Sequence, residues 1–129
     1  ARIGSSQKNV SEVSGYLNAH AKGQKGFILI SAASHDAIIF SSGLPMKQFI
    51  HEGTGEYWDV AIAHPDKWAR WIILRTGDTA DNTYRGLQFN NAFKEKYTKV
   101  HAFPFADIYE IKPQYVDQLQ TKPVDYFNK

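Results

Sequence analysis

Two uninterrupted apolar runs along the chain predict buried β-strands. Phe27–Ile30 and Trp71–Leu74 contain apolar residues only, which is typical of strands that are covered on both faces. Lys47 to Ile50 predicts a shorter strand between them. Because strands buried on both faces occur mainly in parallel sheets, these runs indicate a parallel arrangement.

Apolar residues at helical spacing separate these strands. Ahead of the first strand, Val10, Val13 and Leu17 fall on one helical face, Asn9 predicts the N-cap, and Gly23 predicts the end. The same pattern of a polar cap followed by apolar residues predicts three further helices. They begin after Ser34, after Thr54 and after the turn at Asp78 and Thr79, and the first two end at Gly43 and Pro65.

The last third of the chain has a different pattern. Val100 to Phe103 and Ile108 to Ile111 predict two short strands, and the separation at Pro104 suits an antiparallel hairpin. The remaining stretch, Lys112 to Lys129, has mixed polarity and predicts a short helix near Tyr115 to Leu119 followed by a frayed tail.

Three successive βα units predict the α/β fold class. We expect one domain over residues 1–129, with its core at about 9–111 and a C-terminal extension at 112–129. The expected architecture is a three-layer sandwich, Rossmann-like or flavodoxin-like, with a mostly parallel sheet of order 2-1-3-4-5 and an antiparallel C-terminal hairpin. In such sheets ligands bind beyond the carboxyl ends of the strands, where the strand order reverses.

Composition excludes several kinds of partner and chemistry. The chain has 15 Lys and Arg against 13 Asp and Glu, a net charge of +2 that does not suit nucleic-acid binding. No cysteine is present, which excludes disulfides and thiolate chemistry. No apolar run approaches the roughly 20 residues of a membrane-spanning helix. Because the chain starts with Ala1 and its only methionine is Met46, we expect an excised domain or a processed product.

Polar side chains follow each of the three parallel strands and form the candidate ligand-binding site. No two of them have the spacing of a metal-binding helix or of a known catalytic motif, so we predict no metal, no cofactor and no catalytic residue. Capping and loop solvation account for Ser34, Asp36 and Asp78 equally well. The candidates are Ser34, His35, Asp36, His51, Glu52, Arg75 and Asp78.

Two further clusters have a structural and a functional interpretation. The first consists of Tyr57, Trp58, Trp68 and Trp71, whose aromatic faces suit stacking on sugar rings or lipid headgroups. Aromatic residues beside a buried strand usually pack in the core, and we favour this structural interpretation. A cluster of lysines is best interpreted as a solvated face, with attraction to an anionic membrane as the alternative. These lysines are Lys94, Lys96 and Lys99.

A family resemblance extends along most of the chain. It rests on AIIFSSGLPMKQFIHEGTGEYW at 37–58, PDKW at 65–68, WIILRTGD at 71–78 and FKEKY at 93–97, and it covers roughly residues 9 to 111 in order. These stretches resemble the extracytoplasmic C-terminal domain of bacterial membrane glycosyltransferases. That group is similar to the dolichyl-phosphate-mannose protein mannosyltransferases.

The resemblance implies an accessory role. In such enzymes the membrane helices bind a polyprenyl-phosphate sugar and an acidic residue of the membrane part is the catalytic base, so no catalytic residue is carried over to this chain. The implied partners are the transmembrane part of the same polypeptide, an acceptor glycan or protein, and a nearby membrane surface. The implied location is the extracytoplasmic face of the cell membrane.

Two alternatives remain open at this point. The chain could be a free-standing small α/β enzyme that uses His35, His51, Glu52 or Asp78 at the strand ends. It could also be a protein-interaction domain whose exposed apolar patch packs on a partner.

Overall fold

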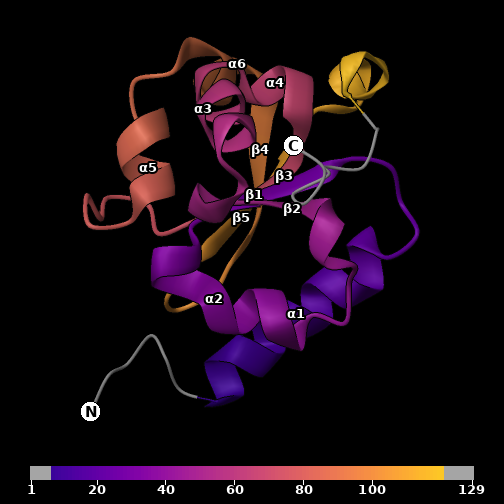
Figure 1. Ribbon diagram of the computed structural model, residues 1–129, viewed down its shortest axis with the longest axis vertical. Helices are drawn as coiled ribbons and strands as arrows, with labels where there is room; N and C mark the ends of the chain where they lie inside the picture. Colours follow the sequence, from indigo (N-terminus) through magenta and orange to yellow (C-terminus); the bar gives the residue numbers. More distant parts are fainter. Residues whose placement is uncertain (1–6, 121–129) are drawn as a thin grey trace.

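The computed structural model describes residues 7–120, which form a mixed α/β fold around one five-stranded sheet (Figure 1). The strand order is β2-β1-β3-β5-β4. β1 pairs in parallel with β2 and β3, whereas β5 pairs antiparallel with both β3 and β4. The strands are β1 (Phe27–Ile30), β2 (Phe49–Ile50), β3 (Ala69–Leu74), β4 (Tyr97–Ala102) and β5 (Asp107–Ile111).

The predicted parallel core and the antiparallel hairpin are confirmed, but the predicted order 2-1-3-4-5 is wrong. β5, not β4, lies beside β3. The reason is burial: Ile108 and Ile111 of β5 are almost fully buried, whereas every residue of β4 after Tyr97 is exposed. The more apolar strand therefore takes the inner position, and the more polar strand forms the edge.

Helices cover both faces of the sheet (Figure 1). α1 and α2 pack on one face, and α3, α4, α5 and α6 pack on the other. Short 3₁₀ helices lie at Met46–Gln48, Glu52–Thr54 and Pro113–Gln118. The α-helices are α1 (Gln7–Ala21), α2 (Ala32–Ser41), α3 (Glu56–Ala63), α4 (Pro65–Trp68), α5 (Asn82–Leu87) and α6 (Asn91–Lys96).

Alternation of side chains along β1 and β3 builds the two halves of the core. Ile28 and Ile73 face α1 and α2, whereas Leu29 and Ile72 face the other helices. All four have no exposed surface, and burial of one such side chain contributes about 2 kcal/mol. The core interpretation of the four aromatic residues is also confirmed. Trp71 is 1% exposed in the core beside α1 and α2, and Tyr57, Trp58 and Trp68 pack against buried residues on the other face.

Most helix starts differ from the predictions by a few residues. α1 begins at Gln7, so Asn9 lies inside the helix. Ser31 caps α2 in place of Ser34, and Asp81 caps α5 in place of the predicted Asp78 and Thr79. In each case a short polar side chain closer to the first helical residue accepts the free backbone amides. Gly55 in place of Thr54 occupies the cap position of α3, and Pro65 begins α4 after α3 has ended at Ala63.

The C-terminal part continues the packing of the described fold. Pro113–Gln118 is a 3₁₀ helix near the predicted helical segment, and Leu119 is buried in the core. The tail predicted beyond Leu119 falls mainly on residues 121–129, which lie outside the described residues. Within residues 7–120, no helix has the length and apolar character needed to cross a membrane.

Candidate functional site

The strand order reverses between β1 and β3, because the chain passes from β1 to β2 on one side and to β3 on the other. Ser31 directly follows β1, Arg75 directly follows β3, and Glu52 lies two residues beyond β2. Polar groups from these three segments and from the start of α5 meet at this carboxyl edge, where the topology predicts a ligand site.

Glu52 is at the centre of one hydrogen-bond network. Its Oε2 accepts from the Ser31 hydroxyl at 2.5 Å and from Asn82 Nδ2 at 2.7 Å, and its Oε1 accepts from the Ala32 amide at 2.6 Å. Burial raises the pKa of Glu52, but hydrogen bonds from Ser31, Asn82 and two backbone amides outweigh it and leave the pKa below its usual range. Glu52 is therefore a fixed carboxylate that links the ends of β1, β2 and α5.

His35 and Asp81 form a second, buried pair. His35 Nε2 lies 2.9 Å from Asp81 Oδ2, and the two side chains are only 5% and 1% exposed. Asp81 also accepts from the backbone amides of Arg75, Thr83 and Tyr84. Because a carboxylate can only accept, His35 Nε2 carries the proton.

The remaining ring nitrogen of His35 has an unusual environment. His35 Nδ1 is buried and has no hydrogen-bond partner among residues 7–120. The residue also interrupts α2, since its backbone angles of φ −137° and ψ 32° are not helical. The centroid of the His35 ring lies 6.0 Å from that of the Phe105 ring, in a tilted arrangement.

The structure brings only some of the predicted site residues together. Glu52, His35 and the backbone of Arg75 belong to the carboxyl-edge networks. Ser34 contributes its backbone amide to the Ser31 hydroxyl, and its side chain is exposed. His51 Nδ1 accepts from the Gly53 amide, and burial lowers its pKa although the charge of Glu52 opposes this effect.

Two predicted residues have side chains outside the networks of Glu52 and Asp81. Asp36 is exposed on α2. Asp78 accepts a hydrogen bond from the Ala80 amide in the turn after β3, so it stabilises the loop. This agrees with the interpretation of Asp78 as a residue that satisfies loop amides. The Arg75 side chain is exposed as well, and its guanidinium makes no hydrogen bond or ion pair within the part of the chain that the structure describes.

Sequence reasoning missed three residues that organise the site: Ser31, Asp81 and Asn82. Ser31 is the first residue after β1, and Asp81 and Asn82 are a polar pair directly before an apolar helical pattern. Both positions have the form of an N-cap signal. Several short polar residues precede each helix, and pattern alone does not distinguish Ser31 from Ser34 or Asp81 from Asp78.

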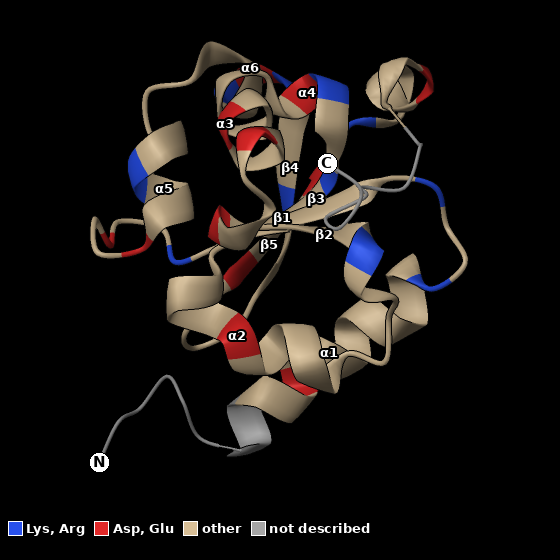
Figure 2. Ribbon diagram, in the orientation of Figure 1, with Lys and Arg blue, Asp and Glu red and all other residues tan. Residues whose placement is uncertain are grey.

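In the view of Figure 2, the basic and acidic residues of the described elements are interspersed. Two of the three lysines that we interpreted as a solvated face are paired: Lys96 Nζ lies 2.8 Å from Asp66, and Lys99 Nζ lies 3.6 Å from Asp107. Lys94 lies over the Phe89 ring. Across the described residues, no three His, Asp or Glu side chains are grouped closely enough to hold a metal ion.

Comparisons of the chain with protein-family models, with curated proteins and with solved structures give no match.

Proposed function

We propose that this chain is a non-catalytic accessory domain of a membrane-embedded glycosyltransferase with a polyprenyl-phosphate sugar donor, and that it helps to bind or position the acceptor. The observation that carries the proposal is that hydrogen-bond donors occupy both carboxylate oxygens of Glu52 and of Asp81. A general base needs a free lone pair and a pKa near the working pH. Glu52 does not suit this role, because its two oxygens already accept three hydrogen bonds and its pKa is lowered.

A positioning role suits the same geometry. The networks around Glu52 and Asp81 join the ends of three strands and two helices, which gives a fixed base for the loops above them. Arg75 directly follows β3 at this edge, and its exposed side chain offers a guanidinium to an acceptor. Charged groups on a rigid support are able to orient hydroxyl-bearing or charged ligands without chemistry of their own.

The proposal includes a more specific fold assignment, a partner and a location. We assign the chain to the flavodoxin-like or Rossmann-like three-layer sandwiches, which is supported by the parallel β2-β1-β3 core with helices on both faces. The proposed partners are the transmembrane part of the same polypeptide and an acceptor glycan or protein near the membrane surface. The proposed location is the extracytoplasmic face of the cell membrane.

Two experiments test this function. The open reading frame that contains this chain is expected to encode several hydrophobic spans, and a frame without any would contradict the proposal. Calorimetric titration of the chain with candidate acceptor glycans and peptides is expected to give saturable heat. If no acceptor binds, and if deletion of the domain leaves transfer intact, the acceptor role is wrong.

One observation favours a second function, that of a small enzyme. His35 and Asp81 form a buried His–carboxylate pair, an arrangement that orients imidazole bases in many enzymes. This alternative predicts turnover by the isolated chain, and alanine replacements at His35, His51, Glu52 or Asp78 that preserve folding would abolish it. The accessory proposal predicts no turnover in the isolated chain.

A further inference from the structure

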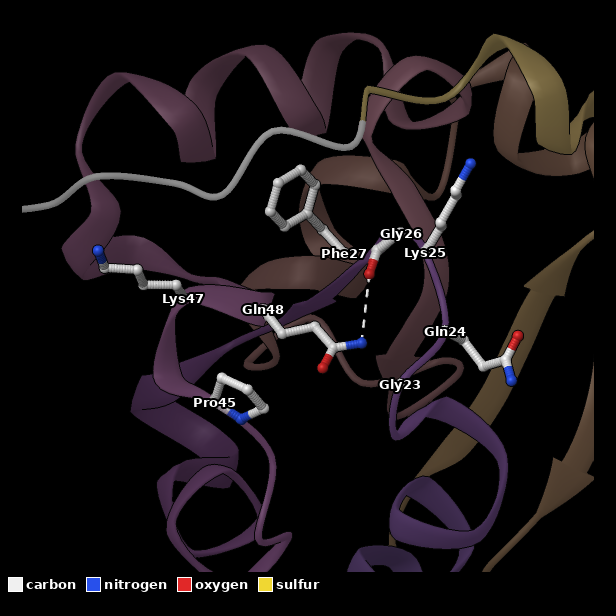
Figure 3. A pocket seen from close by; sticks show the side chains of 8 residues that line it. All are labelled: Gly23, Gln24, Lys25, Gly26, Phe27, Pro45, Lys47 and Gln48. Atoms are coloured by element: carbon white, nitrogen blue, oxygen red, sulfur yellow. Dashed lines mark hydrogen bonds between the residues drawn. The ribbon is translucent and has the colours of Figure 1, made fainter.

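A cavity of about 410 Å³ lies at the amino ends of β1 and β2, at the opposite edge of the sheet from Glu52 and Asp81 (Figure 3). Its size falls within the range of small-molecule sites. The cavity is formed by the loop between α1 and β1 and by the segment that precedes β2. The residues that line it are Gly23, Gln24, Lys25, Gly26, Phe27, Pro45, Lys47 and Gln48.

Side-chain hydrogen bonds hold the loop beside this cavity. Gln48 Nε2 donates to the carbonyl oxygens of Ala21 at 3.2 Å and Gly26 at 3.3 Å, which ties the two walls together. Arg70 donates to the carbonyl oxygen of Lys25 at 3.1 Å. Gly26 has φ +112°, and a Cβ atom there would lie 2.5 Å from Arg70 Cβ, so only glycine fits. The loop is therefore exposed but fixed, as a preformed binding site requires.

The cavity has a cationic rim. Lys25 and Lys47 lie on opposite sides of it in Figure 3, and both are exposed. Neither ammonium makes a hydrogen bond or ion pair with any of residues 7–120. Asp117 lines a smaller neighbouring cavity together with Lys25, but no ion pair joins them in the described part of the chain. Two unpaired cations at one opening favour an anionic ligand.

The walls of the cavity offer a hydrogen-bond acceptor and apolar surface to a ligand. The amide nitrogen of Gln48 is used by the two carbonyl oxygens, and Figure 3 shows its Oε1 turned away from Gly26. This oxygen remains as an acceptor for a hydroxyl group. Pro45 is exposed and adds apolar ring surface to the lining. Such a combination suits a hydroxylated ring that carries a negative charge.

We propose that this cavity binds an anionic monosaccharide, a sugar ring that bears a phosphate or a carboxylate. Lys25 and Lys47 bind the anionic group, the Gln48 amide oxygen accepts from a ring hydroxyl, and Pro45 contacts the ring. The inference does not depend on the accessory role in a transferase, because it concerns another edge of the sheet.

An NMR titration of the 129-residue chain tests this site with two probes, glucose 1-phosphate and glucuronate. The backbone amides of Gly23, Lys25, Gly26, Lys47 and Gln48 are expected to shift saturably with at least one probe. The variant Lys25→Gln/Lys47→Gln is expected to bind that probe about tenfold more weakly or worse. Uncharged glucose is expected to bind at least about tenfold more weakly than the anionic probe.

A matched control removes the same net charge elsewhere. Lys67→Gln/Lys94→Gln changes two exposed lysines that do not line the cavity, and it should leave the affinity unchanged. A result in which neither probe saturates below about 10 mM overturns the proposal. Equal binding of glucose, or an equal loss of affinity in the control variant, overturns it as well. Because all four lysines are exposed, each variant is expected to keep the wild-type spectrum outside its own site.

Discussion

Replacement of Glu52 by glutamine tests whether the carboxyl-edge network stabilises the fold. The substitution keeps the shape of the side chain but turns one acceptor oxygen into an NH₂ donor. That donor must face either the Ala32 amide or the Ser31 hydroxyl and Asn82 amide, which are all donors to Glu52 in the wild type. A lost charge-assisted hydrogen bond costs about 1.5–3 kcal/mol, and solvent access at a half-buried carboxylate reduces this figure. We expect a loss of about 2 kcal/mol in the free energy of unfolding.

Urea denaturation at pH 7 measures this loss. With a slope of about 2 kcal/mol per M for a chain of this size, the midpoint should fall by about 1 M. Glu12→Gln is the matched control, because Glu12 is exposed on α1, and its midpoint should stay within about 0.25 M of the wild type. An unchanged midpoint for Glu52→Gln would show that these contacts do not stabilise the fold.

The pH dependence adds a second readout. The pKa of Glu52 is lower in the folded chain, so its ionised form stabilises the fold above the pKa of the unfolded state. This contribution is lost as the pH falls through the lower, folded value. The difference in unfolding free energy between wild type and Glu52→Gln should therefore stay constant near neutral pH and shrink below about pH 4. A difference that grows on acidification would refute the reasoning.

Three further predictions concern other parts of the molecule. Asp81→Asn should lower the free energy of unfolding by about 3 kcal/mol in urea denaturation, because this buried carboxylate accepts from His35 and from three backbone amides. Gly26→Ala should cost at least about 2 kcal/mol in the same assay, since the new Cβ would overlap Arg70. In an NMR titration the pKa of His51 should lie below its ordinary value, and Glu52→Gln should lower it further because the opposing charge is removed.

Matched controls separate these effects from general sensitivity to substitution. Asp59→Asn removes an exposed carboxylate on α3 and should cost less than about 1 kcal/mol. Gly15→Ala lies in α1 with no heavy atom within 4 Å of the new Cβ, so it should stabilise the chain by about 0.5–1 kcal/mol. Equal losses for Asp81→Asn and Asp59→Asn would contradict the role given to the His35–Asp81 pair. If Gly15→Ala destabilised the chain as much as Gly26→Ala, a clash with Arg70 would not explain the loss at Gly26. If the pKa of His51 were above its ordinary value, burial would not be the dominant influence on it.

The strongest sequence signals predicted the fold because they reflect burial. Phe27–Ile30 is a strand at the predicted bounds, and Trp71–Leu74 falls within β3, since an uninterrupted apolar run is stable only where both faces are covered. The order of the last two strands could not be predicted in this way. A hairpin can join the sheet through either strand, and the choice depends on burial of Ile108 and Ile111 against helices far away in the sequence.

The sequence predicted where the candidate site lies, but it did not predict which residues are hydrogen-bonded to one another. Topology alone located polar residues at the ends of the parallel strands, and Glu52 and His35 do lie there. Their partners Asp81 and Asn82 are about thirty or more residues away in the chain, and the pairing is created by the position of α5. The cavity beside Lys25 was not predicted, because its walls meet through Gln48 and Arg70 contacts that leave no local pattern.

Steady-state transfer kinetics of the complete polypeptide in membranes test the accessory role most directly. The informative variant is Arg75→Gln, which removes an exposed cation at the carboxyl edge and leaves the backbone bond to Asp81 in place. If the domain positions the acceptor, the KM for the acceptor should rise severalfold while kcat stays at the wild-type value. A loss of kcat with an unchanged KM, or no change in either constant, would contradict that role.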